Sequence, residues 1–391
     1  MFLFTFANMI KILILALPAM VCAVIALLLA LNVMGSKNRP QLKLLAFMVV
    51  SFFLYTAHFI FFNDLNDAIP FSDSVYSFCN PAVYPLFFIY VEELTLRRPN
   101  RFYQLLYLLP AILCSVAVGV LYLMMDQQST AQFIEQYLYH DKFSQLEGLA
   151  WWQGVAHWAV KLVFALEIPP VLYYGWKYIT RYNRIVENNY SDTEDKNVAP
   201  VRSLLLLLAI ASVVSFICNL LGRYVFSEYE WLVAVPVVVF SLLLLLIGHV
   251  GLNQRFYAYN MMMDLDSEDE YAEEYSNDLS TKLLRLINEE RLYLRPNLKI
   301  NDLAKQLNSN RNYIYNAINV EMGVSFSEFI NHKRIDYAVR LIEKNPNIPL
   351  SEVATKSGFS SVSTFYRNFR LFKKCAPSDF QLEITEGKKR V

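Results

Sequence analysis

Cysteine is scarce in this 391-residue chain. The five cysteines, Cys22, Cys79, Cys114, Cys218 and Cys375, have no paired spacing, and the first four fall in apolar stretches. This pattern predicts neither a disulfide framework nor a zinc site. The chain also lacks a glycine-rich phosphate loop, a metal-ligand cluster, a kinase-type histidine motif and a nucleophile elbow. We therefore expect no enzymatic activity, no cofactor and no bound metal.

Charged residues are also few, at 18%, whereas hydrophobic residues make up 55% and the mean hydropathy is +0.29. Such a chain is too apolar for a soluble protein of this size, so part of it is expected in lipid. A helix crosses a bilayer core with ~20 apolar residues. Seven runs of about that length are present: 12–34, 42–62, 74–91, 102–125, 154–174, 203–221 and 231–250.

Two of the seven runs carry polar interruptions. The third contains Asn80 and Pro81, and the fifth contains three ionisable residues followed by two prolines. The first run has an alternative interpretation as a cleaved signal peptide. Against it, no charge precedes Lys11 and the apolar span exceeds the ~7–15 residues of a signal-peptide core. The sequence therefore predicts an all-α protein that begins with a seven-helix transmembrane bundle.

Positive charges are concentrated in alternate connections between these runs. They are Lys37, Arg39 and Lys43; Arg97, Arg98 and Arg101; and Lys177, Arg181, Arg184, Lys196 and Arg202. The other connections hold only Lys142 and Arg223. Since Lys and Arg are enriched in cytoplasmic loops, the N-terminus is predicted outside and the C-terminal part in the cytoplasm.

No predicted outer loop is large enough to bind a ligand by itself, because the longest runs only from about Asp126 to Ala150. Its apolar residues recur at helical spacing and predict a short amphipathic helix on the membrane surface. A signal would therefore enter through the bundle or through a partner. His157, Lys161 and Glu167 are the candidate ligand-sensing residues, because ionisable groups within spans are costly and often functional. The alternative is interhelical polar contact, or snorkelling of Lys161.

The chain divides by composition into three predicted parts. Residues 1–253 form the membrane domain, residues 254–279 an acidic juxtamembrane linker, and residues 280–391 a basic soluble domain with 19 Lys and Arg against 11 Asp and Glu. A charged tract of this kind is typical of a solvated linker. The alternative is that it screens the basic domain and competes with phosphates.

The basic domain contains two copies of a short helix, a tight turn and a second helix. In the first copy, KINDLAKQL and the turn 308–310 precede a second helix over 311–321. Its inward stripe is Ile314 and Ile318, and its outer face is polar. The candidate DNA-binding residues of this helix are Arg311, Asn312, Tyr315, Asn316 and Asn319. Asparagine suits base edges because its amide can make two hydrogen bonds with adenine.

In the second copy, PLSEVATKSGF precedes a second helix over 361–373. Phe365, Phe369 and Phe372 are expected to face inward. The candidate DNA-binding residues on the outer face are Ser361, Ser363, Thr364, Arg367, Arg370 and Lys373. Arg367 is placed to engage guanine, and Arg370 and Lys373 to hold phosphate. The alternative, a charged surface on a plain helical bundle, does not account for the same polar pattern in both copies.

These motifs resemble the DNA-binding domain of the AraC/XylS family of bacterial transcriptional regulators. The resemblance rests on DLAKQL, MGVSFSEFINHKRIDYAVRLI, PLSEVATKSGFSSVSTFYRNF and CAPSDF, and covers about a quarter of the chain. It implies two helix-turn-helix subdomains joined by a long linker helix near 326–344. Lys374, Ala376 and Gln381 depart from residues common in the family, and all three lie near the closing turn. No family is recognised in the seven apolar runs.

Together these features predict a membrane-embedded one-component transcriptional regulator. Two linked reading helices one DNA turn apart, ~34 Å, would enter successive major grooves. A signal that favours one conformation of the bundle would shift the conformation of the C-terminal DNA-binding domain, which we call the reader. The expected partners are double-stranded promoter DNA, membrane lipid, RNA polymerase, a second copy of the chain, and a small molecule or membrane protein as signal. The alternatives are a constitutive membrane tether for DNA, or a transporter or receptor with an accessory DNA-binding domain.

Overall fold

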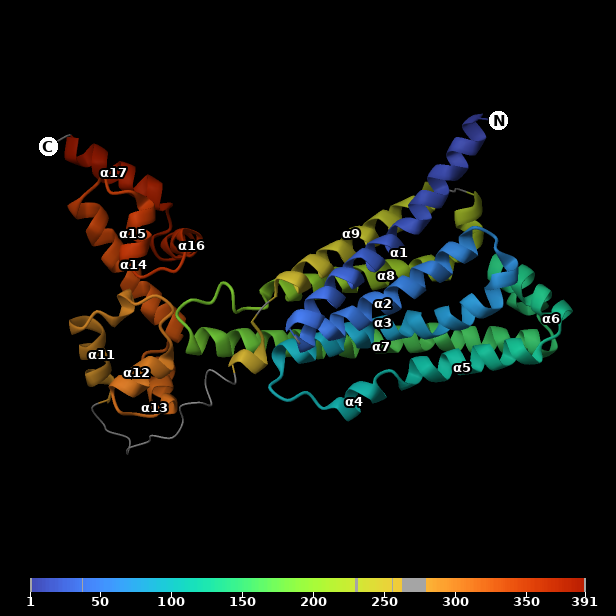
Figure 1. Cartoon of the computed structure of the whole chain (residues 1–391), viewed down its shortest axis with the longest axis horizontal. Helices are drawn as coiled ribbons and strands as arrows, with labels where there is room; N and C mark the ends of the chain where they lie inside the picture. Colours follow the sequence, from blue (N-terminus) through green and yellow to red (C-terminus); the bar gives the residue numbers. More distant parts are fainter. Residues whose placement is uncertain (1, 37, 229–230, 255, 262–278, 390–391) are drawn as a thin grey trace. The chain divides into compact units, whose positions relative to one another are not determined.

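The computed structural model of the protein describes residues 2–36, 38–228, 231–254, 256–261 and 279–389. Every named element in these ranges is helical, and one isolated antiparallel bridge joins Tyr190 to Lys299. The all-α prediction is therefore confirmed (Figure 1). The chain splits into an N-terminal unit, Met1–Thr180 with Val198–Tyr257, and a C-terminal unit, Arg181–Asn197 with Ala258–Val391.

The N-terminal unit is built mainly from long helices, and α4 and α6 are short. The elements are α1 (Phe2–Ser36), α2 (Arg39–Phe62), α3 (Ile69–Thr95), α4 (Arg101–Leu106), α5 (Leu109–Met124), α6 (Gln127–Gln132), α7 (Gly148–Asn189), α8 (Ala199–Glu228) and α9 (Trp231–Asn253). From Arg181 onward, α7 belongs to the C-terminal unit. The start of α2 illustrates the local signals. The side chain of Asn38 accepts a hydrogen bond from the backbone N of Gln41, and Pro40 occupies the first turn, where no partner for its missing N–H is needed.

Six helical segments among the described residues are long and apolar enough to cross a membrane; they lie in α1, α2, the α4–α5 pair, α7, α8 and α9. The sequence predicts a seventh at 74–91, and that run lies within α3. This helix has 27 residues, so its length suffices, and Asp73, Glu92 and Glu93 flank the apolar run. Within the run, Asn80, Pro81 and Pro85 lower the hydropathy. Its residues from Cys79 to Thr95 are all buried among other helices. A helix covered by its neighbours can hold polar residues that a lipid-facing helix cannot.

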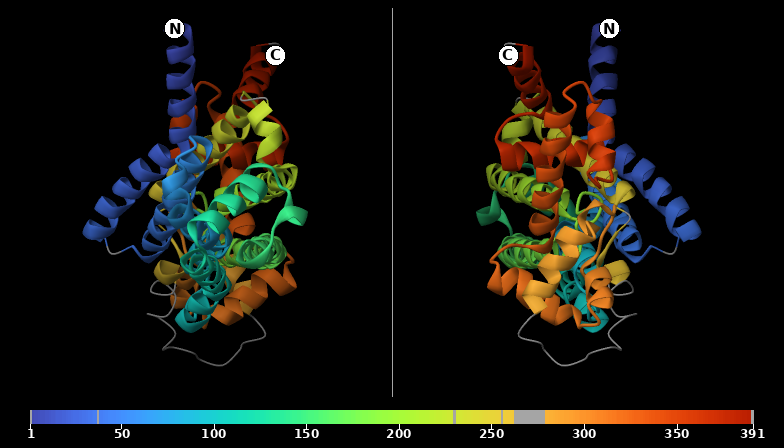
Figure 2. Two further views of the ribbon diagram at one scale, coloured as in Figure 1. Left: turned by 90° about the vertical axis from the view of Figure 1, so that its right-hand side faces the viewer. Right: turned by 90° about the vertical axis from the view of Figure 1, so that its left-hand side faces the viewer.

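The helices of this unit lie side by side (Figure 1). α1 packs against α2 and α9, α2 against α3, α3 against α5, and α8 against α9. α7 joins the bundle through aromatic contacts with α3: the Tyr84 and Phe164 ring centroids are 5.4 Å apart. The turned views of Figure 2 show α5 and α7 nearly end-on. α3 therefore lies at the centre of the packing.

The connection between α5 and α7 folds inward. The predicted amphipathic helix is present as a π-helical turn, Phe133–Tyr139, and its apolar residues Phe133, Ile134 and Tyr137 are buried. Phe133 is fully buried, and its ring lies 5.9 Å from that of Tyr122 in α5 and 5.1 Å from that of His157 in α7. Tyr137 is buried beside it. This packing against α5 and α7 buries the aromatic side chains. Placement on the membrane surface stays a prediction.

The C-terminal unit is a set of short helices with one long helix. The elements are α11 (Leu279–Glu289), α12 (Ile300–Gln306), α13 (Arg311–Tyr315), the π-helical turn Asn316–Glu321, α14 (Phe326–Lys344), α15 (Leu350–Lys356), α16 (Val362–Lys373) and α17 (Pro377–Lys389). The predicted linker helix, 326–344, matches α14 at both ends. Most of the predicted acidic linker, residues 262–278, lies outside the described residues.

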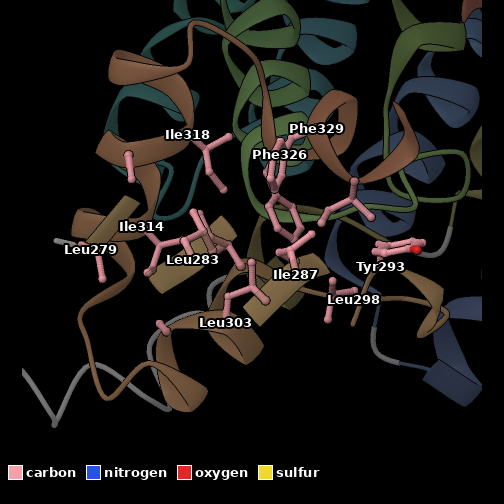
Figure 3. Close-up of a cluster of buried hydrophobic side chains, with 14 residues drawn as sticks. Leu279, Leu283, Ile287, Tyr293, Leu298, Leu303, Ile314, Ile318, Phe326 and Phe329 are labelled. Carbon is pink, nitrogen blue, oxygen red and sulfur yellow. The ribbon is translucent and has the colours of Figure 1, made fainter. Parts of the chain in front are cut away.

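Two hydrophobic cores lie within this unit, and α14 contributes to both. Phe326, Phe329 and Ile330 enter the first core, which includes Leu283, Ile287, Leu303, Ile314 and Ile318 (Figure 3). Ile335, Ala338 and Ile342 enter the second, with Val353, Phe359, Phe365 and Phe369. Each core packs one helix-turn-helix unit onto one half of α14. A single helix shared by two cores holds the two units in a defined relation.

Candidate functional site

The first helix-turn-helix unit is formed by α12, the four-residue turn 307–310, and α13 with its π-helical continuation. Asn308 has a φ of +48° in the turn, a conformation that asparagine tolerates well. The Asn310 side chain caps α13 by accepting a hydrogen bond of 2.8 Å from the backbone N of Asn312. Ile314 and Ile318 are fully buried, as the inward stripe predicts.

The outer face of this helix is partly open. Asn312 and Asn316 are exposed, whereas Arg311, Tyr315 and Asn319 are half-buried. The Asn319 side-chain amide donates a 3.2 Å hydrogen bond to the backbone carbonyl of Tyr315. Asn312 and Asn316 therefore present their amides most freely, four residues apart on one face. Two adjacent amides of this kind can pair with base edges.

The second unit is formed by α15, a turn at Gly358, and α16. Gly358 has a φ of +82°, which favours glycine. Ser361 caps α16, since its hydroxyl accepts a 3.1 Å hydrogen bond from the backbone N of Thr364. Phe365 and Phe369 are fully buried, and Phe372 is half-buried against the same core. Aromatic side chains at this spacing fix which face of α16 points outward.

That outward face carries exposed Ser363, Arg367, Arg370 and Lys373. Lys373 donates to the Asp336 carboxylate of α14 at 3.1 Å, so its charge is partly engaged within the unit. The sequence places Thr364 on this face too, but the structure buries it, with only 1% of its surface exposed. Thr364 lies in the first turn of α16, and its hydroxyl donates a hydrogen bond to the carboxylate of Glu194. Arg367 and Arg370 thus remain as the open guanidinium groups of α16.

A buried arginine at the middle of α14 was not singled out by the sequence. Arg334 is fully buried; its Nε donates to the carbonyl of Tyr293 at 2.7 Å, and one Nη donates to that of Arg295 at 2.9 Å. Its other Nη lies 3.3 Å from the Asp192 carboxylate. Burial lowers the pKa of Arg334 and Asp192 opposes that shift, but an arginine still remains protonated. The sequence did contain a signal for this buried arginine, because Arg334 lies on the apolar stripe of α14 with Phe326, Ile330 and Ile335.

The N-terminal unit contains a cavity of about 290 Å³. Its lining is mostly apolar and aromatic, and it includes His157 and Lys161. His157 Nε2 lies 2.8 Å from the carboxylate of Asp73, which also accepts a 2.7 Å hydrogen bond from the Tyr122 hydroxyl. Lys161 Nζ lies 5.0 Å from the centre of the Trp158 ring. An acid, an imidazole and an ammonium therefore all line this cavity.

Glu167, the third predicted sensing residue, does not line this cavity. Both of its carboxylate oxygens are buried and have no hydrogen-bond partner in the described part of the chain. Of the three predicted sensing residues, His157 and Lys161 therefore line the cavity, and Glu167 lies elsewhere on α7. Asp73 is the member that the sequence missed, because it precedes an apolar run and resembles an ordinary loop acid. Among the described residues, no group of three His, Cys, Asp or Glu could hold a metal ion.

A known protein family matches the helix-turn-helix part of the C-terminal unit. Residues 303–383 match the family described as "Helix-turn-helix domain". The match begins in α12 and ends in α17, so it includes both helix-turn-helix units and the linker helix. This segment is an AraC-type helix-turn-helix domain, and the resemblance inferred from its motifs is confirmed.

Curated relatives share the same segment. The "Msm operon regulatory protein" of Streptococcus mutans is 33% identical over 87 residues, which is 22% of this chain and 31% of that protein. The "TCP pilus virulence regulatory protein" of Vibrio cholerae is 33% identical over 84 residues, 22% of this chain and 30% of that protein. The chain thus spans about a third of the length of these relatives. No solved structure matches the chain significantly.

Proposed function

We propose that this protein is a transcriptional regulator that is embedded in a bacterial cytoplasmic membrane and binds promoter DNA. The observation that carries the proposal is that a DNA-binding domain and apolar helices of membrane-spanning length occur in one chain. An AraC-type helix-turn-helix domain occupies residues 303–383, and six helical segments before it are apolar enough to span a bilayer. The relatives named above are regulatory proteins, which supports the same role for the shared segment.

The arrangement of charge supports a cytoplasmic position for the reader. The connections rich in Lys and Arg and the C-terminal unit belong to the same side of the predicted topology. DNA is available only on that side. The net positive charge of residues 280–391 also favours approach to a phosphate backbone, in a salt-dependent manner.

Within the reader, α13 with its continuation and α16 are the proposed reading helices. Asn312 and Asn316 supply exposed amides on the first, and Arg367 and Arg370 supply exposed guanidinium groups on the second. A planar guanidinium can pair with the O6 and N7 atoms of guanine. Arg370 lies one turn further along α16, away from the end that enters the groove in helix-turn-helix proteins, and suits a phosphate.

The test is genome-wide DNA occupancy of the full-length protein in its native cells, measured by crosslinking under several nutrient and stress conditions. Discrete sites upstream of a few operons support a regulator. Arg367→Ala is expected to erase the preference for those sites, at about 1–3 kcal/mol for the base pair it reads, because two hydrogen bonds to guanine are lost. Arg370→Ala is the matched control, expected to weaken binding to all sequences and to reduce the salt slope by about 1.

The assignment of base reading to Arg367 is wrong if Arg367→Ala binds its sites with unchanged preference. Diffuse occupancy by the wild-type protein contradicts a promoter-specific regulator. A constitutive membrane tether is favoured if occupancy at discrete sites is the same in every growth condition and transcription from those sites does not change.

The cavity in the N-terminal unit is the proposed entry point of the signal. Its volume of about 290 Å³ and its aromatic lining suit a small, largely apolar molecule. Lys161 and the Asp73–His157 pair are polar groups in its lining. A molecule that fits one arrangement of the helices better than another would shift the balance between them.

Filling this cavity is expected to abolish the response to conditions. Ala211 is buried and lines the cavity, so Ala211→Phe would occupy the space with a benzyl side chain. We expect a promoter bound by the protein to lose its change in output between growth conditions. Val116→Phe is the control, since Val116 is 56% exposed on α5 and does not line the cavity. The cavity is not the sensing site if Ala211→Phe accumulates normally in the membrane and retains full regulation.

A further inference from the structure

The connection between α7 and α8 belongs to the C-terminal unit. Residues Arg181–Asn197 group with Ala258–Val391 and not with the remainder of the bundle. Tyr190 forms an antiparallel bridge with Lys299, and the backbone N of Ser191 donates to the carbonyl of Leu298 at 3.0 Å. The Ser191 carbonyl accepts from the side chain of Asn331 at 3.0 Å. We call residues 190–194 the docked segment, because backbone hydrogen bonds attach it to the DNA-binding unit.

Asp192 anchors the docked segment in the interior of the unit. One carboxylate oxygen accepts from the backbone N of Asn297 at 2.8 Å, and the other lies 3.3 Å from Arg334 Nη1. The side chain of Arg334 is fully buried and that of Asp192 is 6% exposed. A buried guanidinium needs an anion close by. The anion comes from a segment that joins two predicted membrane spans.

Glu194, two residues further on, lies at the start of the second reading helix. Its carboxylate accepts hydrogen bonds from the hydroxyls of Ser361 at 3.4 Å, Ser363 at 3.3 Å and Thr364. This contact explains why Thr364 is buried. The first turn of a helix attracts anions, because its N–H groups and dipole point outward there. Glu194 therefore places a negative charge where α16 would meet DNA.

We propose that the docked segment is an autoinhibitory contact in which Glu194 occupies the DNA-facing end of α16. In helix-turn-helix proteins the N-terminal residues of the reading helix contact base edges. A carboxylate held by three hydroxyls there competes for the same donors and repels the phosphate backbone. DNA binding then requires Glu194 to leave its position. The inference rests on the proposed function, since it assumes that α16 reads DNA.

The docked segment is also the covalent continuation of α7 and α8. α7 ends at Asn189, α8 begins at Ala199, and His157 and Lys161 lie on α7 itself. A change in the bundle that moves the end of α7 must therefore act on the segment that carries Glu194. This route to the reader is shorter in sequence than the route through the acidic linker.

The test uses full-length protein reconstituted in lipid nanodiscs. Its affinity is measured for a fluorescent duplex that carries one of the crosslinked sites, and for a scrambled duplex of equal length. Glu194→Gln is expected to lower the Kd for the site by about tenfold, because hydrogen bonds to a charged acceptor are weakened and a phosphate can take their place. Asp195→Asn is the matched control. It removes one negative charge at the next residue, which is exposed, and is expected to change the Kd little.

A second measurement tests the displacement itself. By reciprocity, the duplex should release the docked segment, so trypsin cleavage after Lys196 should become faster when the specific duplex is added. The inference is overturned if wild type and Glu194→Gln bind the duplex equally, or if Asp195→Asn raises affinity as much as Glu194→Gln. Failure of every protein, wild type included, to bind DNA overturns the proposed function and this inference with it.

Discussion

Replacing Gly358 by alanine is expected to unfold the second helix-turn-helix unit. A Cβ at this position would lie 2.6 Å from the carbonyl oxygen of Leu294 and 2.7 Å from its carbonyl carbon. These are backbone atoms, which cannot move aside as the end of a side chain can. The φ of +82° adds ~1–2 kcal/mol of strain for any residue with a Cβ. We expect a loss of about 4 kcal/mol in the free energy of unfolding, at the upper end for single substitutions.

Gly323→Ala is the matched control for this prediction. Gly323 has a φ of +71° but has no atom within 4 Å of an added Cβ, so only the backbone strain applies, ~1 kcal/mol. The measurement is pulse proteolysis of full-length protein in detergent, which gives the urea concentration at which the C-terminal unit becomes cleavable. Equal midpoints for the two variants would mean that contact with Leu294 does not limit this turn.

Replacing Asp192 by alanine is expected to destabilise the C-terminal unit by about 3–5 kcal/mol, because it leaves the buried guanidinium of Arg334 without its anion. The double change Asp192→Ala with Arg334→Met is expected to recover most of this loss, since an apolar side chain of similar length leaves no buried charge. Pulse proteolysis of the single and double variants forms a double-mutant cycle that isolates the pair.

An exposed ion pair in the same unit provides the control. Arg285 and Glu289 lie 3.4 Å apart on α11, with their side chains 76% and 69% exposed. Glu289→Ala should change the free energy of unfolding by no more than about 0.5 kcal/mol, because water screens the pair. If Asp192→Ala behaves like Glu289→Ala, then water reaches Arg334 readily and the docked segment is not an integral part of the unit. A large loss would instead make the segment between α7 and α8 part of the folded reader.

Asp192→Ala tests the stability of the C-terminal unit, whereas Glu194→Gln tests its affinity for DNA. Asp192 holds the segment in place, whereas Glu194 is exposed and its carboxylate hydrogen-bonds to the start of α16. Glu194→Gln should therefore leave the stability of the unit nearly unchanged while it alters DNA affinity. This separation allows inhibition to be measured without unfolding.

The closing turn shows how a departure from a family pattern is accommodated. Lys374 occupies a position where glycine is common in the resembling family, and the structure places it in the left-handed region with a φ of +61° at the end of α16. Glycine is favoured there because it has no Cβ to clash. Both reading helices are formed nonetheless. Lys374 caps the C-terminal end of α16, beyond its proposed DNA-binding residues.

Much of the architecture follows from short-range patterns that the sequence carries by itself. Apolar runs of about 20 residues determined the long helices, and the spacing of Ile314 with Ile318, and of Phe365 with Phe369, determined which faces turn inward. The motifs resembling the AraC/XylS family placed the linker helix at its observed ends. Such patterns are legible because helix geometry relates residues only three or four positions apart.

Only the tertiary structure decided which distant residues meet. It paired His157 with Asp73 across 84 positions, set Glu167 apart from both, and brought Glu194 to α16 across 170 positions. It also buried Thr364, which helical periodicity places on an outer face. Periodicity assigns a side chain to a face of its own helix but contains nothing about what covers that face. The partners depend on how separate elements pack, and that packing is a property of the whole fold.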